Sequence, residues 1–176
     1  LRALMNLVAR DVRRAGYDDL SLERVGTGTD GPADLSPHAR MQIVGGDSGC
    51  VAFSYDRAGN TAGIREDSEL RAFRRGTVSG IGVLQMRTGA GTSCDAGDGW
   101  DTLSDPNAVD IRRFGVVLSA VNAPIGPGSA PIRVRDLDLA LEGNLLNAQD
   151  TVRAIQTRIR VRADCVREDL TECDSL

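Results

Sequence analysis

A single amphipathic helix pattern, followed only by strand-like segments, is the feature that most constrains this fold. In residues 1–17, apolar side chains recur at intervals of three and four, which places them on one face of a helix. Gly16 is well placed to end this helix. The apolar face holds Leu1, Leu4, Met5, Val8, Val12 and Ala15, and the other face holds Arg2, Asn6, Arg10, Arg13 and Arg14. We expect the apolar face to pack on the rest of the chain.

The remaining sequence consists of runs that are typical of β-strands. Short runs at residues 41–44, 50–55, 70–75 and 81–86 are separated by turns rich in Gly or Asp. Longer runs follow at residues 111–121, 132–141 and 152–161, and the last two alternate apolar with polar side chains. One helix followed by many strands predicts an α+β fold, in which the helix lies across one face of a half-buried antiparallel sheet.

The length of 176 residues suits one domain, residues 1–176. Within it we expect a helix at 1–17, a β-rich head at 38–164 and a C-terminal tail at 165–176. Residues 18–37 are rich in Gly, Asp, Thr, Ser and Pro and predict a surface loop. The helical pattern opens at Leu1 without a capping residue, so we expect the helix to continue upstream of this sequence.

The four cysteines, Cys50, Cys94, Cys165 and Cys173, predict disulfides and an oxidising compartment. None lies in a C-x-x-C pair and His38 is the only histidine, so a zinc site would need all four cysteines at awkward spacing. Four cysteines permit three pairings, of which we favour Cys50–Cys94 with Cys165–Cys173. The second pair would close a short loop that limits fraying of the tail.

Charge and motifs argue against several functional classes. The net charge is −4 with both signs interleaved, which does not favour nucleic-acid binding. The glycines of residues 26–31 lack the Lys and the strand-to-helix setting of a phosphate-binding loop. No run of about 18 apolar residues is present that could span a bilayer.

Catalytic and metal-binding patterns are weak. His38 follows Ser36 in a polar segment, and we expect it to be a surface loop residue rather than a catalytic base. Asp136 and Asp138 should lie on the same face of their strand, without further oxygen ligands nearby. Residues 56–62 match a calcium loop at too few positions and suit a turn. We therefore expect no enzyme activity, no catalytic residues, no cofactor and no metal.

Two surface features each allow two interpretations. Trp100, the only tryptophan, could stack on a sugar, but beside a disulfide we favour a core anchor. The arginines of the last long strand could bind an anion or a partner, although a solvated strand face commonly has this composition, and we favour that second interpretation. These arginines are Arg153, Arg158, Arg160 and Arg162.

Several short strings occur here in the order in which they occur in PilW-type minor type IV pilins. Residues 7–17, LVARDVRRAGY, resemble the end of the long helix of that family. Residues 50–56, CVAFSYD, resemble the strand that carries a family cysteine. The Gly59-Asn60 turn, the strand at 69–74 and Cys94 ahead of GWDTLSD at 99–105 follow in matching order. The resemblance covers about residues 1–120 and does not include the tail from Cys165 to Cys173.

The resemblance implies a pilin-like fold, in which the helix at 1–17 is the truncated C-terminal half of a longer spine. It implies a minor pilin, processed and methylated as a prepilin, that primes or caps pilus assembly and supports twitching motility, adhesion or DNA uptake. Its partners would be other minor and major pilins, with no small-molecule substrate. The protein would reside in the bacterial inner membrane and then in the extracellular pilus, with this domain on the periplasmic or extracellular side.

Within this resemblance, one set of residues would carry helix packing and filament continuity: Leu1, Leu4, Met5, Val8 and Val12. Two alternatives remain open at this point. The first is a pseudopilin in the tip complex of a type II secretion system, which has a similar architecture. The second is a binding module at the pilus tip that recognises a glycan or DNA.

Overall fold

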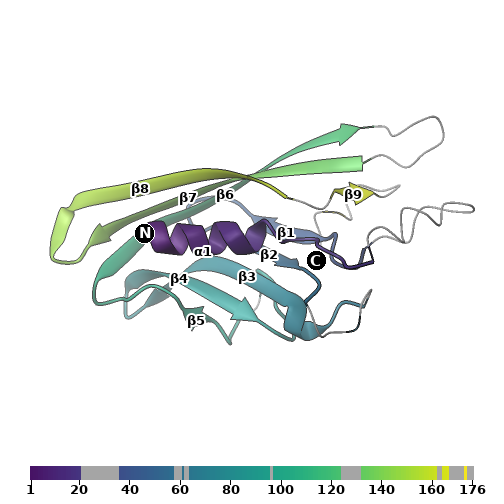
Figure 1. The fold of residues 1–176 in the computed structure, drawn as a ribbon. Helices are drawn as coiled ribbons and strands as arrows, with labels where there is room; N and C mark the ends of the chain where they lie inside the picture. Colours follow the sequence, from purple (N-terminus) through teal and green to yellow (C-terminus); the bar gives the residue numbers. More distant parts are fainter. Residues whose placement is uncertain are drawn as a thin grey trace, which may run out of the picture.

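The structure is a computed structural model that describes residues 1–20, 36–57, 61, 64–95, 97–123, 132–161, 164–166 and 173. Over these residues the chain forms one α-helix, α1 (Arg2–Val12), a 3-10 turn, η1 (Asp67–Glu69), and two antiparallel sheets. Figure 1 shows α1 lying between the two sheets. The helix-then-strands order predicted from the sequence is therefore present.

The first sheet contains the short strands and the second contains the long ones. Sheet A has the order β1-β2-β3-β4-β5, and its strands are β1 (Met41–Val44), β2 (Cys50–Ser54), β3 (Leu70–Val78), β4 (Ile81–Thr88) and β5 (Asp101–Thr102). Sheet B has the order β6-β7-β8, with β6 (Val109–Ala123), β7 (Ile132–Leu145) and β8 (Ala148–Arg160). A short strand, β9 (Cys165–Val166), pairs with the beginning of β7. The expected strands are thus found, and the later ones are longer than their apolar runs suggested.

The expectation of one sheet is wrong, because the strands divide into two sheets. The sheets meet where β6 passes beside the β1–β2 turn: Phe114 N donates to Asp47 O at 2.9 Å, and Gly49 N donates to Phe114 O at 2.8 Å. A Cβ atom on Gly49 would lie 2.6 Å from Phe114 O, so only glycine allows this approach. Alternating polarity predicts strands but not which strands pair, and the division was therefore not visible in the sequence.

The hydrophobic core lies where α1 faces both sheets. Sheet A contributes large side chains, and Phe53 stacks at 6.3 Å on Phe73 and at 6.2 Å on Tyr55. Sheet B contributes the inward residues of its three long strands. The buried members from the three layers are Met5, Val8, Ala9, Val12 and Ala15 of the N-terminal segment, Met41, Val51, Phe53, Phe73 and Leu84 of sheet A, and Ile111, Phe114, Val116, Leu137, Leu139, Leu141 and Ile159 of sheet B. All three layers therefore share one core.

The tail is tied to sheet B through a buried charge. Arg135 on β7 is fully buried, and its Nη1 donates to Cys173 O at 2.9 Å. Cys173 is bonded to Cys165, which pairs with Arg133 in the β7–β9 ladder. The family resemblance does not include this tail, although the sequence favoured the Cys165–Cys173 pairing. In the structure, the carbonyl of Cys173 accepts a hydrogen bond from a guanidinium group that is buried in sheet B.

The Cys50–Cys94 disulfide fastens the segment between β4 and β5 to sheet A. Cys50 at the start of β2 is bonded to Cys94, so the cysteines pair as Cys50–Cys94 and Cys165–Cys173. Cys94 N also donates to Gln42 Oε1 on β1 at 2.8 Å. The segment between β4 and β5 is therefore attached to two neighbouring strands, β1 and β2.

Removing the Cys50–Cys94 disulfide, which closes the larger of the two loops, should lower the stability of the protein substantially. Cys50 and Cys94 are 44 residues apart, a loop for which chain entropy gives a contribution of about 4 kcal/mol. We expect Cys50→Ser to lower the melting temperature by roughly 8–16 °C in calorimetry under oxidising conditions.

Cys165→Ser serves as the comparison, because its loop of 8 residues gives only about 2.5 kcal/mol by the same relation. An unchanged melting temperature in Cys50→Ser would contradict a Cys50–Cys94 bond.

Candidate functional site

The apolar face of α1 is the surface by which the helix docks on the head. Met5, Val8 and Val12 are at most 2% exposed, and Leu1 and Leu4 are partly buried and pack against the same core. Helices in proteins gain most of their stability from packing of an amphipathic face, so this packing stabilises α1. The five residues that the sequence singled out thus share one docked face.

The end of the helix is fixed to strand β2. The regular helix stops at Val12, and two tighter turns carry the chain to Gly16, whose φ of +76° suits glycine. Gly16 N donates to Ser54 O and Asp56 N donates to Tyr17 O, both at 2.9 Å. The chain that leaves α1 therefore lies beside the end of β2 and cannot turn independently of it.

The exposed face of α1 carries a row of arginines. Arg2, Arg10 and Arg13 are all exposed, and Asn6 lies between them on the same face. Arg10 makes only a loose contact with Asp11, with Nε and Oδ1 3.8 Å apart. We call the face of Arg2, Asn6, Arg10 and Arg13 the helix stripe. It gives a chain of net charge −4 a local positive surface.

A buried polar cluster lies beside the C-terminal end of α1. His38 Nδ1 is 3.1 Å from Ser54 Oγ, and His38 Nε2 is 3.8 Å from Glu69 Oε2. All three side chains are fully buried, so the expectation that His38 is a surface loop residue is wrong. The polar sequence around it is misleading, because burial here comes from β2 and η1 folding over the segment. Ser36, its neighbour in sequence, instead accepts a hydrogen bond from His38 N at 3.2 Å.

Carboxylates surround this histidine and bind the adjacent backbone. Glu69 accepts hydrogen bonds from Arg57 N at 3.1 Å and from Glu66 N at 2.7 Å. Asp18 accepts from Leu20 N at 2.9 Å, and Asp56 accepts from Asp19 N at 3.3 Å. The cluster therefore joins the end of α1, the end of β2 and the turn η1.

Burial is the main influence on His38. It lowers the pKa of the imidazole below its ordinary value, and Arg65 acts in the same direction. The carboxylates Glu69, Asp18 and Asp56 oppose this shift because each favours the charged ring. The net effect is a histidine that stays neutral in the folded protein at neutral pH.

Ser54, His38 and Glu69 have the residue types of a nucleophilic triad but not its accessibility. A triad needs a hydroxyl that a substrate can reach, and Ser54 is 0% exposed. The hydroxyl instead occupies a closed polar cluster between three elements. This geometry suits a structural role.

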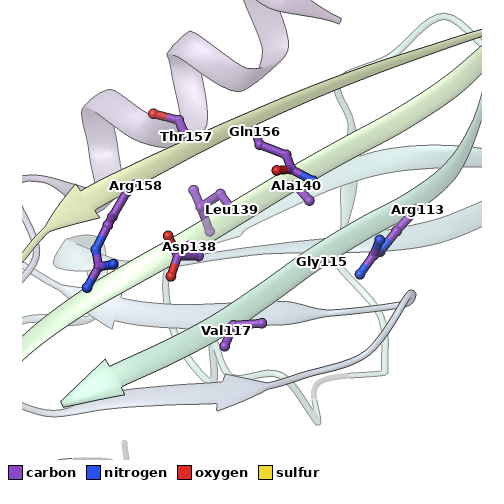
Figure 2. A pocket seen from close by; sticks show the side chains of 9 residues that line it. All are labelled: Arg113, Gly115, Val117, Asp138, Leu139, Ala140, Gln156, Thr157 and Arg158. Atoms are coloured by element: carbon purple, nitrogen blue, oxygen red, sulfur yellow. The ribbon is translucent and has the colours of Figure 1, made fainter.

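The outer face of sheet B carries a shallow groove, shown in Figure 2. Its floor is formed by Gly115 and Ala140, which face each other across β6 and β7. The charged side chains at its rim are largely neutralised: Arg113 pairs with Asp47 at 2.9 Å, and Arg158 pairs with Asp136 at 3.1 Å. The remaining lining residues are Val117, Asp138, Leu139, Gln156 and Thr157.

The acidic pair on β7 and the arginines of β8 that the sequence drew attention to both belong to sheet B. Asp136 and Asp138 do share the outer face of β7, and over the parts of the chain that the structure describes no cluster of metal-ligating side chains is found. Arg160 pairs with Asp164 at 2.8 Å, while Arg153 is exposed. Arg162, most of the 56–62 loop and the 26–31 glycines lie outside the described residues.

Trp100 is not the core anchor that the sequence suggested. It is only partly buried, and the guanidinium carbon of Arg74 lies 3.9 Å from its ring centroid. Arg74 pairs with Cys50 across β2 and β3, so the Trp100 ring lies near the Cys50–Cys94 bond on the face of sheet A that points away from Phe53 and Phe73. The core is built around Phe53 and Phe73 instead.

The fold, the two disulfides and the enclosed polar cluster define the class of this protein. An amphipathic helix docked between antiparallel sheets, with two disulfides and an enclosed polar cluster, is an α+β head domain of an oxidising compartment. The family model described as prepilin peptidase-dependent protein B matches residues 1–161, and the chain belongs to that family. It is therefore a pilus-related protein, which indicates pilus components as partners and a periplasmic or extracellular location.

The other comparisons add nothing to this assignment. Neither the curated proteins nor the solved structures gave a match. The family that matches is not specifically the PilW type that the short strings resemble. Among the described residues, no helix is long and apolar enough to cross a membrane.

His38 should make folding stability depend on pH. Its pKa is lowered in the folded state, so the unfolded chain binds more protons below about pH 6.5. Stability should therefore fall as the pH drops from 7 towards 5, by at most about 1.4 kcal/mol per pH unit. Melting temperatures measured across this range check the slope.

His38→Asn is the matched control, because its amide can keep the contact with Ser54 without titrating. No other histidine contributes in this window. An equal slope in the wild type and in His38→Asn would contradict the assignment.

Docking of α1 can be tested with one new carboxylate on either side of the helix. Val8→Asp buries an unpaired charge in the core, and we expect it to lower the free energy of unfolding by about 4 kcal/mol or more. Asn6→Asp adds the same group to the exposed face and should change it by less than about 0.5 kcal/mol. Similar losses in chemical denaturation would show that α1 is not packed as described.

Proposed function

We propose that this chain is the head of a minor type IV pilin of the PilW kind, which primes or caps pilus assembly. In this role it supports twitching motility, adhesion or DNA uptake. The observation that carries the proposal is the docking of α1, whose apolar face is used by the head while its arginine face remains exposed. Membership of the prepilin peptidase-dependent family agrees with that role.

The helix has two separate surfaces for two separate tasks. The buried face couples α1 to both sheets, so a force or displacement on the helix is passed to the whole head. The helix stripe is available to acidic groups of a neighbouring subunit, since opposite charges steer and orient protein contacts. The proposed partners are therefore other pilins, reached along the exposed side of α1.

A structural role without catalysis is part of the proposal. Ser54 with His38 and Glu69, an arrangement of described residues that resembles catalytic machinery, is enclosed. The groove on sheet B is shallow, and its arginines are paired with aspartates. These observations favour an assembly subunit over a hydrolase.

The proposal is tested in the host bacterium with the full-length gene. Deletion should abolish or strongly reduce surface pili and twitching motility while leaving protein secretion intact, and the wild-type gene should restore both. Pili counted by electron microscopy and twitching zones are the measurements. Loss of secreted enzymes with normal pili would instead assign the chain to a type II secretion system and overturn the pilus role.

The helix stripe should matter for assembly more than for folding. We expect the triple variant Arg2→Glu, Arg10→Glu, Arg13→Glu to reduce piliation at least several-fold, with a melting temperature within a few degrees of the wild type, because all three positions are exposed.

Arg65→Glu is the control, since Arg65 is an exposed arginine outside the helix. If the triple variant and Arg65→Glu assemble pili equally well, the stripe is not an assembly surface.

A further inference from the structure

The edge of β6 is covered along its first half and open along its second. Near Phe114 the backbone N–H and C=O both bond to the β1–β2 turn, at Asp47 O and Gly49 N. Pairing with β7 continues without a bulge from Arg113 to Ala123, so every second residue keeps this orientation. Leu118, Ala120 and Asn122 therefore direct both backbone groups away from β7, and no described residue bonds to those groups.

This open edge lacks the usual protection against strand pairing. Proteins guard exposed edges with charged side chains, proline, bulges or a covering element. Residues 116–123, VVLSAVNA, contain no charge, no proline and no glycine in a chain that is 26% charged. Val117 and Val121 are also 56% and 66% exposed, on the same outer face of the strand with Ser119 between them. Figure 1 shows β6 as the outermost ribbon of its sheet at this end.

We infer that two copies of this chain pair antiparallel through the open edge of β6, in a register centred on Ser119. The edge residues point their backbone groups outward at even positions, so Leu118 of one copy exchanges two hydrogen bonds with Ala120 of the other. In the same register Val117 lies opposite Val121 of the second copy, twice by symmetry. Val117 of each head then packs against Val121 of the other head, as β-branched pairs do across strands.

The sequence of this edge favours a second copy of the chain as its binding partner. The partner strand must be extended, uncharged and β-branched where it meets Val117 and Val121, and β6 itself has this sequence. On the outer face of β7, Asp136 lies opposite Ser119 and pairs with Arg158 at 3.1 Å, and Asp138 lies opposite Val117. Both carboxylates are one strand away from the paired edge, so neither directly faces its counterpart across the two-fold axis.

The inference goes beyond the proposed pilus role. An antiparallel pair turns the two heads, and their α1 helices, in opposite directions. It concerns free heads rather than subunits aligned in one filament, and the experiment on this chain does not depend on whether pili form.

Cysteine cross-linking tests both the pairing and its register. The four native cysteines are bonded in pairs, so an added cysteine is the only free thiol. Ser119 faces its own counterpart at a pair without hydrogen bonds, a spacing at which a disulfide can close. We expect Ser119→Cys to give a covalent dimer under mild oxidation on non-reducing gels. Val121→Cys is the control. In this register the cysteine at position 121 of one copy faces Val117 of the other copy rather than a second cysteine, so it should give at least several-fold less covalent dimer.

A second variant tests the hydrogen bonds of the edge without adding a thiol. Ala120 directs its N–H outward, so Ala120→Pro removes a donor to the partner strand and none to β7. In sedimentation equilibrium we expect the wild-type mass to rise with concentration towards a dimer, and the folded Ala120→Pro protein to remain a monomer.

Val121→Arg places a charge against the partner strand and should give the same monomer if the proline variant fails to fold. A monomeric wild type at all concentrations, a dimer that survives both substitutions, or stronger cross-linking by Val121→Cys than by Ser119→Cys would each overturn the inference.

Discussion

Burial of one apolar stripe of α1 between two sheets is the interaction on which the rest of the structure depends. Met5, Val8 and Val12 are each nearly inaccessible, and burying such side chains contributes about 1.5–3 kcal/mol apiece. Their sum approaches the 5–15 kcal/mol that is the typical net stability of a domain. Helices in proteins gain most of their stability from packing of an amphipathic face, and the inner faces of the sheets would be exposed without α1. Helix and sheets therefore stabilise each other in one cooperative unit.

Polar contacts and disulfides hold the parts of the domain that lie outside this core. At the C-terminal end of α1, hydrogen bonds to β2 and the cluster around His38 fix the direction of the outgoing chain. Further from the helix, the disulfides fasten segments that have little apolar area of their own, and the buried guanidinium of Arg135 meets the carbonyl of Cys173. Polar contacts thus fix orientation where hydrophobic packing alone is not directional.

Local patterns in the sequence were sufficient for the helix and the strands, because periodicity depends only on neighbouring residues. They were not sufficient for pairing. The separation of β6 from sheet A depends on a close approach at Gly49, which no run of residues encodes. His38 lies in a polar segment, yet β2 and η1 bury it. Trp100 follows a disulfide-bonded cysteine, yet its ring contacts Arg74 outside the core. Each error concerns a contact made across the fold.

The lengths of the two sheets explain why surface is left over for association. Strands of sheet A reach 9 residues at most, whereas β6 has 15. Sheet A can therefore cover only the first part of β6, and the strand continues past it with β7 as its one described neighbour on that sheet. This extension leaves two valines exposed and leaves edge backbone groups to which no described residue bonds. An exposed, uncharged edge of this kind is a template for pairing with another strand. The difference in strand length between the two sheets is therefore an argument for a partner at this edge.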